Sequence, residues 1–456
     1  IYTLSLHDAL PIYQPPRCGR ISRGDKPETK SCIWKEEKMN RYFELSEKVY
    51  DITERYPQVL DLLISKGFDN LRNEMMRKTL GKTIALEQAL RMKKIDIALF
   101  EAEAEEILSG GKLNLSDGLV KAELHSDTAQ MSIEGVLPCP VKLQLLEKIE
   151  KLIEDEKIDI NMDLQSASLG LDPIIEKVRK SRSADDLADI YISAGFNLFF
   201  DKDLIGKYME QGVFADQSGW DHINPDFENA TIDLRDPLKR YSIIGVVPAV
   251  MVVNTAVLGD RPMPSRWEDL LAPEFRNSIS LPVRDLDMFN ALMLGWYKLF
   301  GFDGIRKLGE NLLEGMHPAQ MVKGAKSAQG TQPAVSIAPW FFAQMAKESG
   351  PLKTVWPEEG AIVSPIFLIT KASVRERIKP VVDFLYSKDV AETIYVDGKF
   401  PSTNPALDNR LTSDQKFVWI GWDVIHHEDV GKLLRDAEAA FFNQSNRTIL
   451  KIGARR

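Results

Sequence analysis

Cysteine is scarce in this sequence, with only three among 456 residues, at Cys18, Cys32 and Cys139. Three widely separated thiols do not supply the even, closely spaced set that a disulfide framework or a cysteine-based zinc site requires. The adjacent pair His426 and His427 also lacks the i, i+4 spacing that places two imidazoles on one helix face. We therefore expect no metal site and no cofactor.

Long apolar runs and an excess of positive charge are also missing. The longest strongly apolar run, residues 243–253, is much shorter than the ~20 residues that cross a bilayer. The net charge is −9 at pH 7, whereas nucleic-acid binding depends on clustered positive charge. With 44% hydrophobic and 27% charged residues, the composition is typical of a globular protein. We expect no transmembrane segment and no nucleic-acid partner.

The first twelve residues, "IYTLSLHDALPI", do not have the pattern of a secretory signal. No Lys or Arg precedes their apolar residues, and Ser5, His7 and Asp8 interrupt them. The stretch resembles the translation of a sequencing-library adapter. Residues 35–39, "KEEKM", fit a ribosome-binding site that is read through into its own start codon. Residues 1–38 are therefore interpreted as a non-native leader.

The start predicted at Met39 determines the expected cellular location. The residues that follow, "MNRYFELSEKVYD", offer no apolar signal core. We therefore predict a cytoplasmic protein. The alternative is an extracellular or periplasmic location, reached through an export signal that the pattern does not reveal.

Residues 39–108 have the pattern of a small all-helical domain. Pro57 fits an early helical position, an apolar face follows it, and Gly67 fits the position after a helix end. The segment resembles a helical domain of unknown function that occurs beside sensor and redox-associated modules. Residues 109–130, which begin with "SGGKLNLSDG", are predicted to be a linker.

From residue 131 the pattern changes to alternating strands and helices. Strands are predicted at residues 132–137, at residues 158–164 and within "LADIYISAG". Helices are predicted between them, in "PCPVKLQLLEKIEKLIEDEK" and at residues 173–180. The order βαβαβ indicates a parallel sheet and an α/β fold class.

The second half of the chain carries a family resemblance. The long apolar strand in "YSIIGVVPAVMVVNT" leads into "SRWEDLLAPEF" and the strand "SISLP", followed by "QPAVSIAPWFF", "GAIVSPIFLITKASVRERIKPVVDFLYSKDVAETIY" and "GKFPSTNP". In this order the segments resemble the type 2 periplasmic-binding-protein family, the solute-binding components of ABC importers, and most of all its ferric and polyamine branch. The resemblance implies a two-lobed α/β module, with lobe 1 at residues 131–245, lobe 2 at 246–364, and a hinge return with C-terminal helices at 365–456.

Candidate ligand-binding residues follow from where ligands bind in this fold class. In open α/β sheets a ligand lies beyond the carboxyl ends of the strands, where turns and helix N-termini present N–H groups. This rule selects turns in both lobes and positions in the hinge. The predicted residues are Cys139, Lys142, Ser166, Ser168, Ser193 and Gly195 in lobe 1, Pro248, Ser364, Ser402 and Asn404 in the hinge, and Asp285, Asp287, Trp340 and Glu359 in lobe 2.

Several of these residues have an equally reasonable structural role. Asp285 and Asp287 either recognise a cationic ligand or cap the helix that follows them. Trp340 either stacks on a ligand or packs in the core, and Glu359 either lines the cleft or lies in a solvated loop. The pattern alone does not choose between these roles.

The identity of the ligand also stays open at this point. Ferric-binding members of the resembled family typically use two tyrosines near the C-terminal hinge. Tyr386 and Tyr395 are predicted within or at the end of a helix and do not form an adjacent pair. Ferric binding is therefore not expected, and acidic and aromatic candidates are compatible with a polyamine.

The function implied by the resemblance is that of an ABC-transporter solute-binding protein. Such a protein encloses a small molecule or ion between its two lobes by hinge closure, and its expected partner is an ABC permease. The same fold leaves two alternatives, a cytoplasmic ligand sensor and an enzyme that uses Cys139 as a thiolate near a helix N-terminus. Because the sequence shows no base for such a thiol, we predict that the protein is not an enzyme.

Overall fold

The computed structural model describes residues 42–442 with several gaps. The gaps are residues 66–67, 94, 96, 98–99, 102–103, 105–107, 109–120, 125, 127, 130, 167–170, 284, 323–329, 347–349 and 397. The predicted leader and the first part of the predicted linker lie outside the described residues.

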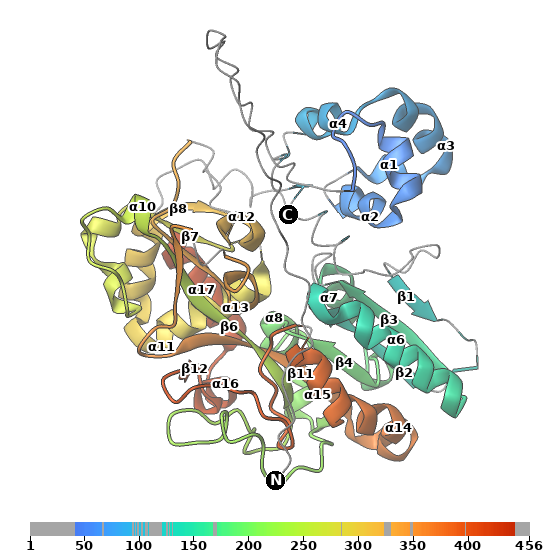
Figure 1. Ribbon diagram of the computed structural model, residues 1–456. Coiled ribbons are helices and arrows are strands. Elements are labelled where there is room, and N and C mark those ends of the chain that lie inside the picture. The colour runs from blue at the N-terminus through green and yellow to red at the C-terminus, as the bar shows by residue number, and fades with distance from the viewer. Residues whose placement is uncertain are drawn as a thin grey trace, which may run out of the picture. The chain divides into compact units, whose positions relative to one another are not determined.

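The first described part of the chain is a small helical domain, drawn in blue in Figure 1. Pro57 occupies the first position of its second helix, as predicted, because proline has no N–H to donate there. The domain has an apolar core of its own that includes Ile52, Leu63, Leu86 and Phe100. Its helices are α1 (Val49–Arg55), α2 (Pro57–Ser65), η1 (Asp69–Arg72), α3 (Glu74–Met76), η2 (Arg77–Gly81) and α4 (Leu86–Met92).

Lobe 1 is built on the predicted βαβαβ unit, which the structure confirms. Its strands β2 (Met131–Leu137), β3 (Ile160–Ser166) and β4 (Ile190–Ser193) are parallel, with β2 between the other two. Helices α6 (Cys139–Glu156) and α7 (Asp172–Lys180) connect them. Apolar residues alternate with polar ones along β3, where Ile160, Met162 and Leu164 are buried, whereas all four residues of β4 are buried.

One further strand of lobe 1 lies within the stretch predicted to be a linker. Strand β1 (Lys121–Leu124) pairs antiparallel with β3 and forms the edge of the sheet. Its sequence, "KAEL", alternates polar and apolar residues over only four positions, which is too short for periodicity to distinguish a strand from a loop. Short polar strands are common at sheet edges because they discourage pairing with other chains.

Two long strands pass through both lobes and connect them (Figure 1). Strands β6 (Ser242–Asn254) and β11 (Ala361–Lys371) pair antiparallel. The strand order β1-β3-β2-β4-β11-β6-β9-β7-β8 places β4 of lobe 1 beside β11 and β9 of lobe 2 beside β6. We call residues 245–248 of β6 together with residues 363–366 of β11 the hinge segment. The lobe limits predicted at residues 245 and 364 lie at or within it and stay predictions.

Lobe 2 is organised around parallel strands and a long helical segment that is kinked at Gly301. Strands β7 (Ile279–Leu281) and β9 (Val335–Pro339) are parallel, and α11 (Leu286–Asn311) packs against the hinge strand β11. The other elements of lobe 2 are α10 (Thr255–Leu258), η5 (Glu268–Leu271), η6 (Pro273–Phe275), β8 (Leu312–Gly315), α12 (Pro318–Val322), α13 (Trp340–Ala343) and β10 (Leu352–Val355).

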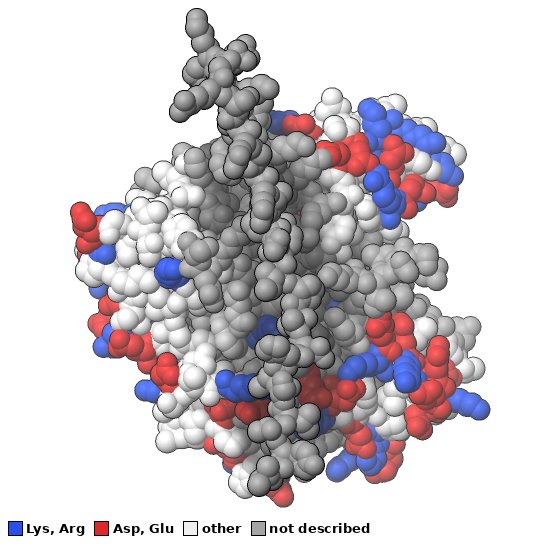
Figure 2. Space-filling model, viewed as in Figure 1, with Lys and Arg blue, Asp and Glu red and all other residues white. Residues whose placement is uncertain are grey.

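The chain after β11 returns to both lobes in turn. Helices α14 and α15 contribute to the core of lobe 1, whereas α17 packs on α11. On the face drawn in Figure 2, Lys and Arg lie interspersed with Asp and Glu over α6 and α14. The elements not yet named are η4 (Ala184–Asp186), α8 (Phe196–Phe200), α9 (Gly206–Glu210), β5 (Phe214–Ala215), η7 (Ala372–Val374), α14 (Arg375–Leu385), α15 (Lys388–Val396), β12 (Phe417–Val418), α16 (Trp422–His427) and α17 (Val430–Phe442).

Candidate functional site

The strand ends of the two lobes point at the hinge segment from opposite sides. Strand β4 ends at Ser193, which pairs with Phe367 of β11. Strand β9 ends at Pro339, which pairs with Ala249 of β6. The two ends are separated by the length of the hinge segment, roughly 17 Å at the rise of a β-strand. Because ligands of α/β sheets bind beyond strand ends, this convergence marks the candidate site.

One position makes the hinge segment accessible. Of the thirteen residues of β6, Val247 alone is less than fully buried. Ser364 pairs directly with Val247 across the strands, so both side chains lie on the same face. Ser364 is 2% exposed, and among the described residues its hydroxyl has no hydrogen-bond partner. Buried hydroxyls normally have a hydrogen-bond partner. The Ser364 hydroxyl is therefore an unusual polar group on an otherwise apolar surface of the hinge segment.

The same face of the hinge strands is covered on both sides of Val247. Toward lobe 1, a Cβ atom at Gly245 would lie 3.2 Å from the Ile394 side chain of α15. Toward lobe 2, a Cβ atom at Gly295 of α11 would lie 2.7 Å from the Ile362 side chain of β11. The partly open position therefore lies between a helix of lobe 1 and a helix of lobe 2.

Lobe 1 contributes the start of α6 to the site. This 18-residue helix begins directly after β2, and Pro138 at its N-cap offers no side-chain acceptor to the helix N–H groups. Lys142 in its first turn is buried, and Val141 belongs to the same core cluster as Ile366 of the hinge segment. The positive end of the helix dipole and an ammonium group thus occur together at the end of β2.

The turn after β4 is closely packed. The Ser193 hydroxyl is buried and accepts a hydrogen bond from the Gly195 N–H at 3.1 Å. A Cβ atom at Gly195 would lie 2.4 Å from a methyl group of Leu171, so a larger residue would require the Leu171 side chain to move. Both residues were predicted as ligand contacts, and the structure gives them an internal role that also fixes the turn beside the hinge.

Lobe 2 contributes an acidic turn at the start of α11. Asp285 caps this helix, since its carboxylate accepts a hydrogen bond from the Met288 N–H at 3.1 Å. Asp287 in the first turn is half-buried. Burial, and to a smaller extent the charge of Asp285, raises the pKa of the Asp287 carboxyl from 3.8 to about 7. Capping, one of the two roles that the sequence left open, is thus established for Asp285.

The raised pKa of Asp287 predicts a pH-dependent stability. The folded protein holds the Asp287 proton up to about pH 7, whereas the unfolded chain releases it near pH 4, so stability falls as pH rises between these values. Asp287→Asn should therefore raise the free energy of unfolding by about 1–2 kcal/mol at pH 8, after allowance for partial exposure, and leave it unchanged near pH 4. Urea unfolding at the two pH values checks this.

Asp285→Asn provides the control for that experiment. Asparagine caps helices as well as aspartate does, so this variant keeps the cap and removes only the neighbouring charge. The fall in stability should then still begin near pH 4, but it should end at a lower pH and be smaller than in the unchanged chain. An Asp287→Asn variant with the same gain at both pH values would contradict the assignment.

Aromatic side chains follow β9 at the edge of lobe 2. Trp340 is half-buried and meets Trp356 edge to face, with 5.3 Å between ring centroids. Phe341 packs against the core clusters of both lobes, as Val247 does, and lies 6.2 Å from the ring of Phe400. Trp340 therefore combines a packing contact with surface that a ligand can reach.

Comparison with known proteins identifies two parts of the chain. The model of the family described as bacterial extracellular solute-binding protein matches residues 185–428, which is more than half of the chain. The chain belongs to the bacterial extracellular solute-binding proteins. Residues 43–100 match a domain of unknown function (DUF1858), which confirms the resemblance stated for the helical domain. No curated protein matches the sequence.

Solved structures show the same fold as this solute-binding protein. The periplasmic binding protein P5PA is 17% identical with a TM-score of 0.50, over 69% of this chain and 99% of that one. AfuA from Actinobacillus pleuropneumoniae, with fructose-6-phosphate bound, is 16% identical with a TM-score of 0.51, over 70% and 99%. The ferric binding protein from Campylobacter jejuni is 15% identical with a TM-score of 0.49, over 70% and 100%. The first two confirm the two-lobed fold, and the family match confirms an ABC-transporter-type solute-binding protein.

The predicted cytoplasmic location is wrong. The matching family consists of bacterial extracellular solute-binding proteins. The expectation rested on the residues after Met39, and these do not by themselves determine export. Among the helices that the structure describes, none has the length and hydropathy of a membrane span.

Three predicted ligand contacts of this solute-binding protein have other partners. The Glu359 carboxylate accepts hydrogen bonds from the Trp267 N–H at 3.1 Å and from Arg266 at 3.4 Å. Ser402 donates to the Ile244 carbonyl at 2.8 Å, and the Asn404 side chain donates to the Tyr386 carbonyl at 2.9 Å. These contacts hold the turn before β11 and the segment beside β6 in place, so the three residues act as structural supports.

The other predicted positions are distributed around the same hinge. Pro248 is buried in the hinge segment, Cys139 starts α6, and Ser166 ends β3, while Ser168 lies outside the described residues. Tyr386 follows α14 and packs on Trp220, with 5.2 Å between the ring centroids. Within the described ranges, no three His, Cys, Asp or Glu side chains come together as a metal site.

Two residues of the site were missed by sequence reasoning. Val247 stands inside an apolar run in which every neighbour is also apolar, so no feature of the run distinguishes it. Phe341 lies in a run of three aromatic residues, and nothing in the run distinguishes it from its neighbours. Its contact with both lobes depends on the return of the chain at Phe400, which local sequence does not report.

Proposed function

We propose that this solute-binding protein captures a small anionic solute at the hinge segment and passes it to an ABC permease. The observation that carries the proposal is the start of α6. A long helix whose first N–H groups receive no side-chain cap begins beside the hinge, with the buried Lys142 in its first turn. Such helix starts favour anions such as phosphate or carboxylate.

The charges of lobe 2 support the placement of the anion in lobe 1. Asp285 already occupies the N-terminus of α11, and a second acid, Asp287, follows it. An anionic group is therefore favoured on the α6 side and disfavoured on the α11 side. AfuA, which shares this fold, is known with a sugar phosphate bound, so the fold accommodates such a ligand.

A cationic ligand such as a polyamine is the second candidate, and Asp285, Asp287 and Glu359 are the residues that would bind it. Glu359 is engaged by Arg266 and the Trp267 N–H, and Asp285 by the Met288 N–H. Of these three acids, Asp287 is the one to which no hydrogen bond has been assigned above. The acidic positions therefore support a polyamine less than α6 supports an anion.

The proposal is tested by calorimetric titration of the full chain with glucose 6-phosphate, inorganic phosphate, citrate and spermidine. We expect binding of the anions and none of spermidine. Lys142→Met should weaken the affinity for glucose 6-phosphate about 10- to 100-fold, because a charge-assisted hydrogen bond in a buried site contributes roughly 1.5–3 kcal/mol.

Lys148→Met is the matched control, since Lys148 lies on the same helix and pairs with Asp389 at 2.6 Å, away from the helix start. This variant should bind as the unchanged chain does. Binding of spermidine in place of the anions, or equal effects of the two lysine variants, would reject the anionic assignment.

We further propose that the ligand is released unchanged, as the family to which the chain belongs suggests. The solute recovered after incubation should have its original mass, and Cys139→Ser should bind it normally. Turnover that depends on Cys139 would contradict this. The permease is tested by ATP hydrolysis of a reconstituted transporter, which the loaded protein should stimulate.

A further inference from the structure

The hydroxyl of Ser364 requires an explanation that the fold alone does not supply. Ser364 lies at the centre of a hinge strand, is 2% exposed, and has no hydrogen-bond partner among the described residues. Its neighbours on the same face are apolar along both strands, with Ile362 and Ile366 on β11 and Val247 opposite. An isolated hydroxyl in such surroundings costs free energy unless something bonds to it.

The surroundings of Ser364 also define what can bond to it. The one partly exposed residue of β6, Val247, lies directly across from it, so a bound molecule reaches the hydroxyl from this side. A carboxylate, phosphate or ammonium placed against Ile362, Ile366 and Val247 would lose its hydration without an opposite charge nearby. A hydroxyl or carbonyl group loses less and can form the missing hydrogen bond.

We infer that Ser364 selects ligands that carry an uncharged hydroxyl or carbonyl group beside their anionic group. The inference rests on the proposed function, because it assumes that the anion lies at the start of α6. It narrows the ligand class from small anions in general to hydroxylated or carbonyl-bearing anions, such as phosphate esters of polyols. A bare inorganic oxyanion leaves Ser364 unpartnered.

The test compares two probes and two variants by calorimetric titration. Glucose 6-phosphate should bind the unchanged chain at least about 10-fold more tightly than inorganic phosphate. Ser364→Ala should remove most of that difference, weakening glucose 6-phosphate about 10-fold and leaving inorganic phosphate unaffected. The thermal stability of the ligand-free Ser364→Ala chain should change little, because the lost hydroxyl had no partner in the protein.

Thr370→Val is the matched control on the same strand. Thr370 is also a buried hydroxyl residue of β11, but it donates to the Ala215 carbonyl at 2.8 Å, away from the hinge segment. This variant should lower thermal stability and leave both affinities unchanged. The pair of variants therefore separates a hydroxyl that serves the ligand from one that serves the fold.

The outcomes distinguish the inference from the proposed function. If both anions bind and Ser364→Ala alters neither affinity, the inference is wrong and the anionic assignment stands. The inference is also wrong, and the anionic assignment still stands, if Ser364→Ala lowers the thermal stability but changes neither affinity. That result is expected for a hydroxyl that bonds to an internal water. If neither anion binds, the proposed function fails, and the inference fails with it.

Discussion

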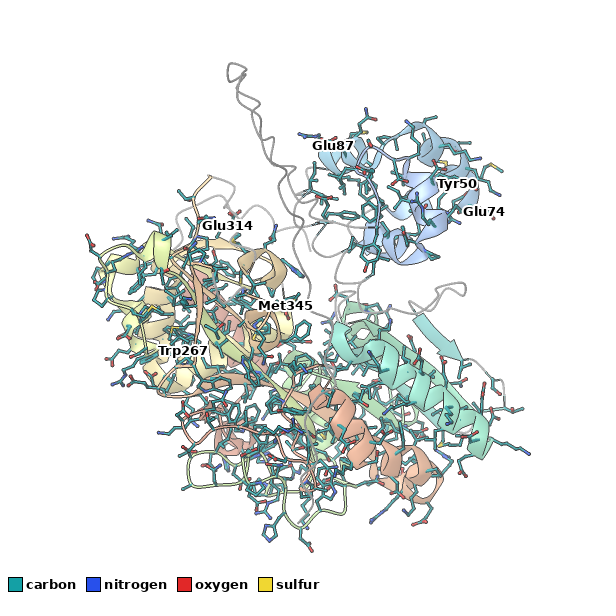
Figure 3. The ribbon with its side chains drawn as sticks, in the orientation of Figure 1. Tyr50, Glu74, Glu87, Trp267, Glu314 and Met345 are labelled. Carbon is teal, nitrogen blue, oxygen red and sulfur yellow. The ribbon has the colours of Figure 1, made fainter. Side chains whose placement is uncertain are left out.

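Replacing Trp267 with Ala should lower the free energy of unfolding by about 4–6 kcal/mol, the largest single effect we expect. Trp267 lies in lobe 2 (Figure 3), is fully buried and meets Trp296 edge to face at 5.9 Å. Its indole N–H donates to the Gly360 carbonyl at 2.8 Å. Truncation leaves a large cavity and a buried carbonyl without its donor, and these two costs add.

The position of Trp267 explains why its loss should be so severe. Its indole fixes the residue directly before β11, and its backbone N–H is held by Glu359. The short segment around "RWEDLL" therefore anchors the start of a hinge strand. This is a structural reason for the motif that carried part of the family resemblance.

Trp356→Ala is the comparison for this prediction. Trp356 also donates its indole N–H to a backbone carbonyl, that of Lys416 at 2.8 Å, but it is only half-buried. The Trp356→Ala replacement should lower the free energy of unfolding by about 1–3 kcal/mol, because it removes much less buried area than Trp267→Ala does. Denaturant unfolding followed by circular dichroism measures both. Equal losses would show that burial of Trp267 is not what stabilises this lobe.

The second large effect is expected from Asp189, which lies at the start of β4. Its carboxylate accepts a hydrogen bond from the Ser132 N–H at 3.0 Å and lies 3.5 Å from the Lys371 ammonium and 3.4 Å from the Arg377 guanidinium. Lys371 is itself buried at the end of β11. Asp189→Ala leaves that ammonium without its carboxylate and should cost about 3–5 kcal/mol.

Two further variants make the Asp189 prediction specific. Asp383→Ala removes an acid from the exposed pair with Lys379 and should cost no more than about 1 kcal/mol. Combining Asp189→Ala with Lys371→Met should recover part of the loss, because no unpaired charge is then buried. If Asp189→Ala behaved like Asp383→Ala in denaturant unfolding, the buried pair would not stabilise lobe 1.

Much of the fold could be predicted because its signals are local. The strands of lobe 1 are short segments with buried apolar residues, and α6 is amphipathic over eighteen residues. The alternation of such strands with helices indicates a parallel sheet. Strand β1 was missed because four alternating residues at a sheet edge carry too little pattern. Its assignment depends on β3, with which it pairs.

The sequence pointed to a region for the candidate site but did not indicate what each side chain there does. The strand-end rule directed attention to the hinge, where Ser364 is buried. Ser402 and Glu359 also lie beside hinge strands, yet their side chains bond to the protein itself. Which hydroxyl or carboxylate is satisfied internally depends on backbone groups that are distant in sequence. Composition and spacing therefore could not separate ligand contacts from supports.

The pairing of β4 with β11 has a consequence for how the chain acquires its structure. Ile190 pairs with Thr370, so lobe 1 cannot be completed until about 180 further residues have been synthesised, on the order of 10–40 s at ~5–20 residues per second. During that interval β4 has an open edge, which is a template for pairing with other chains. Contacts this distant also slow folding, since the loop must close before they form. Aggregation during synthesis should therefore depend on β4 more than on any residue of the hinge.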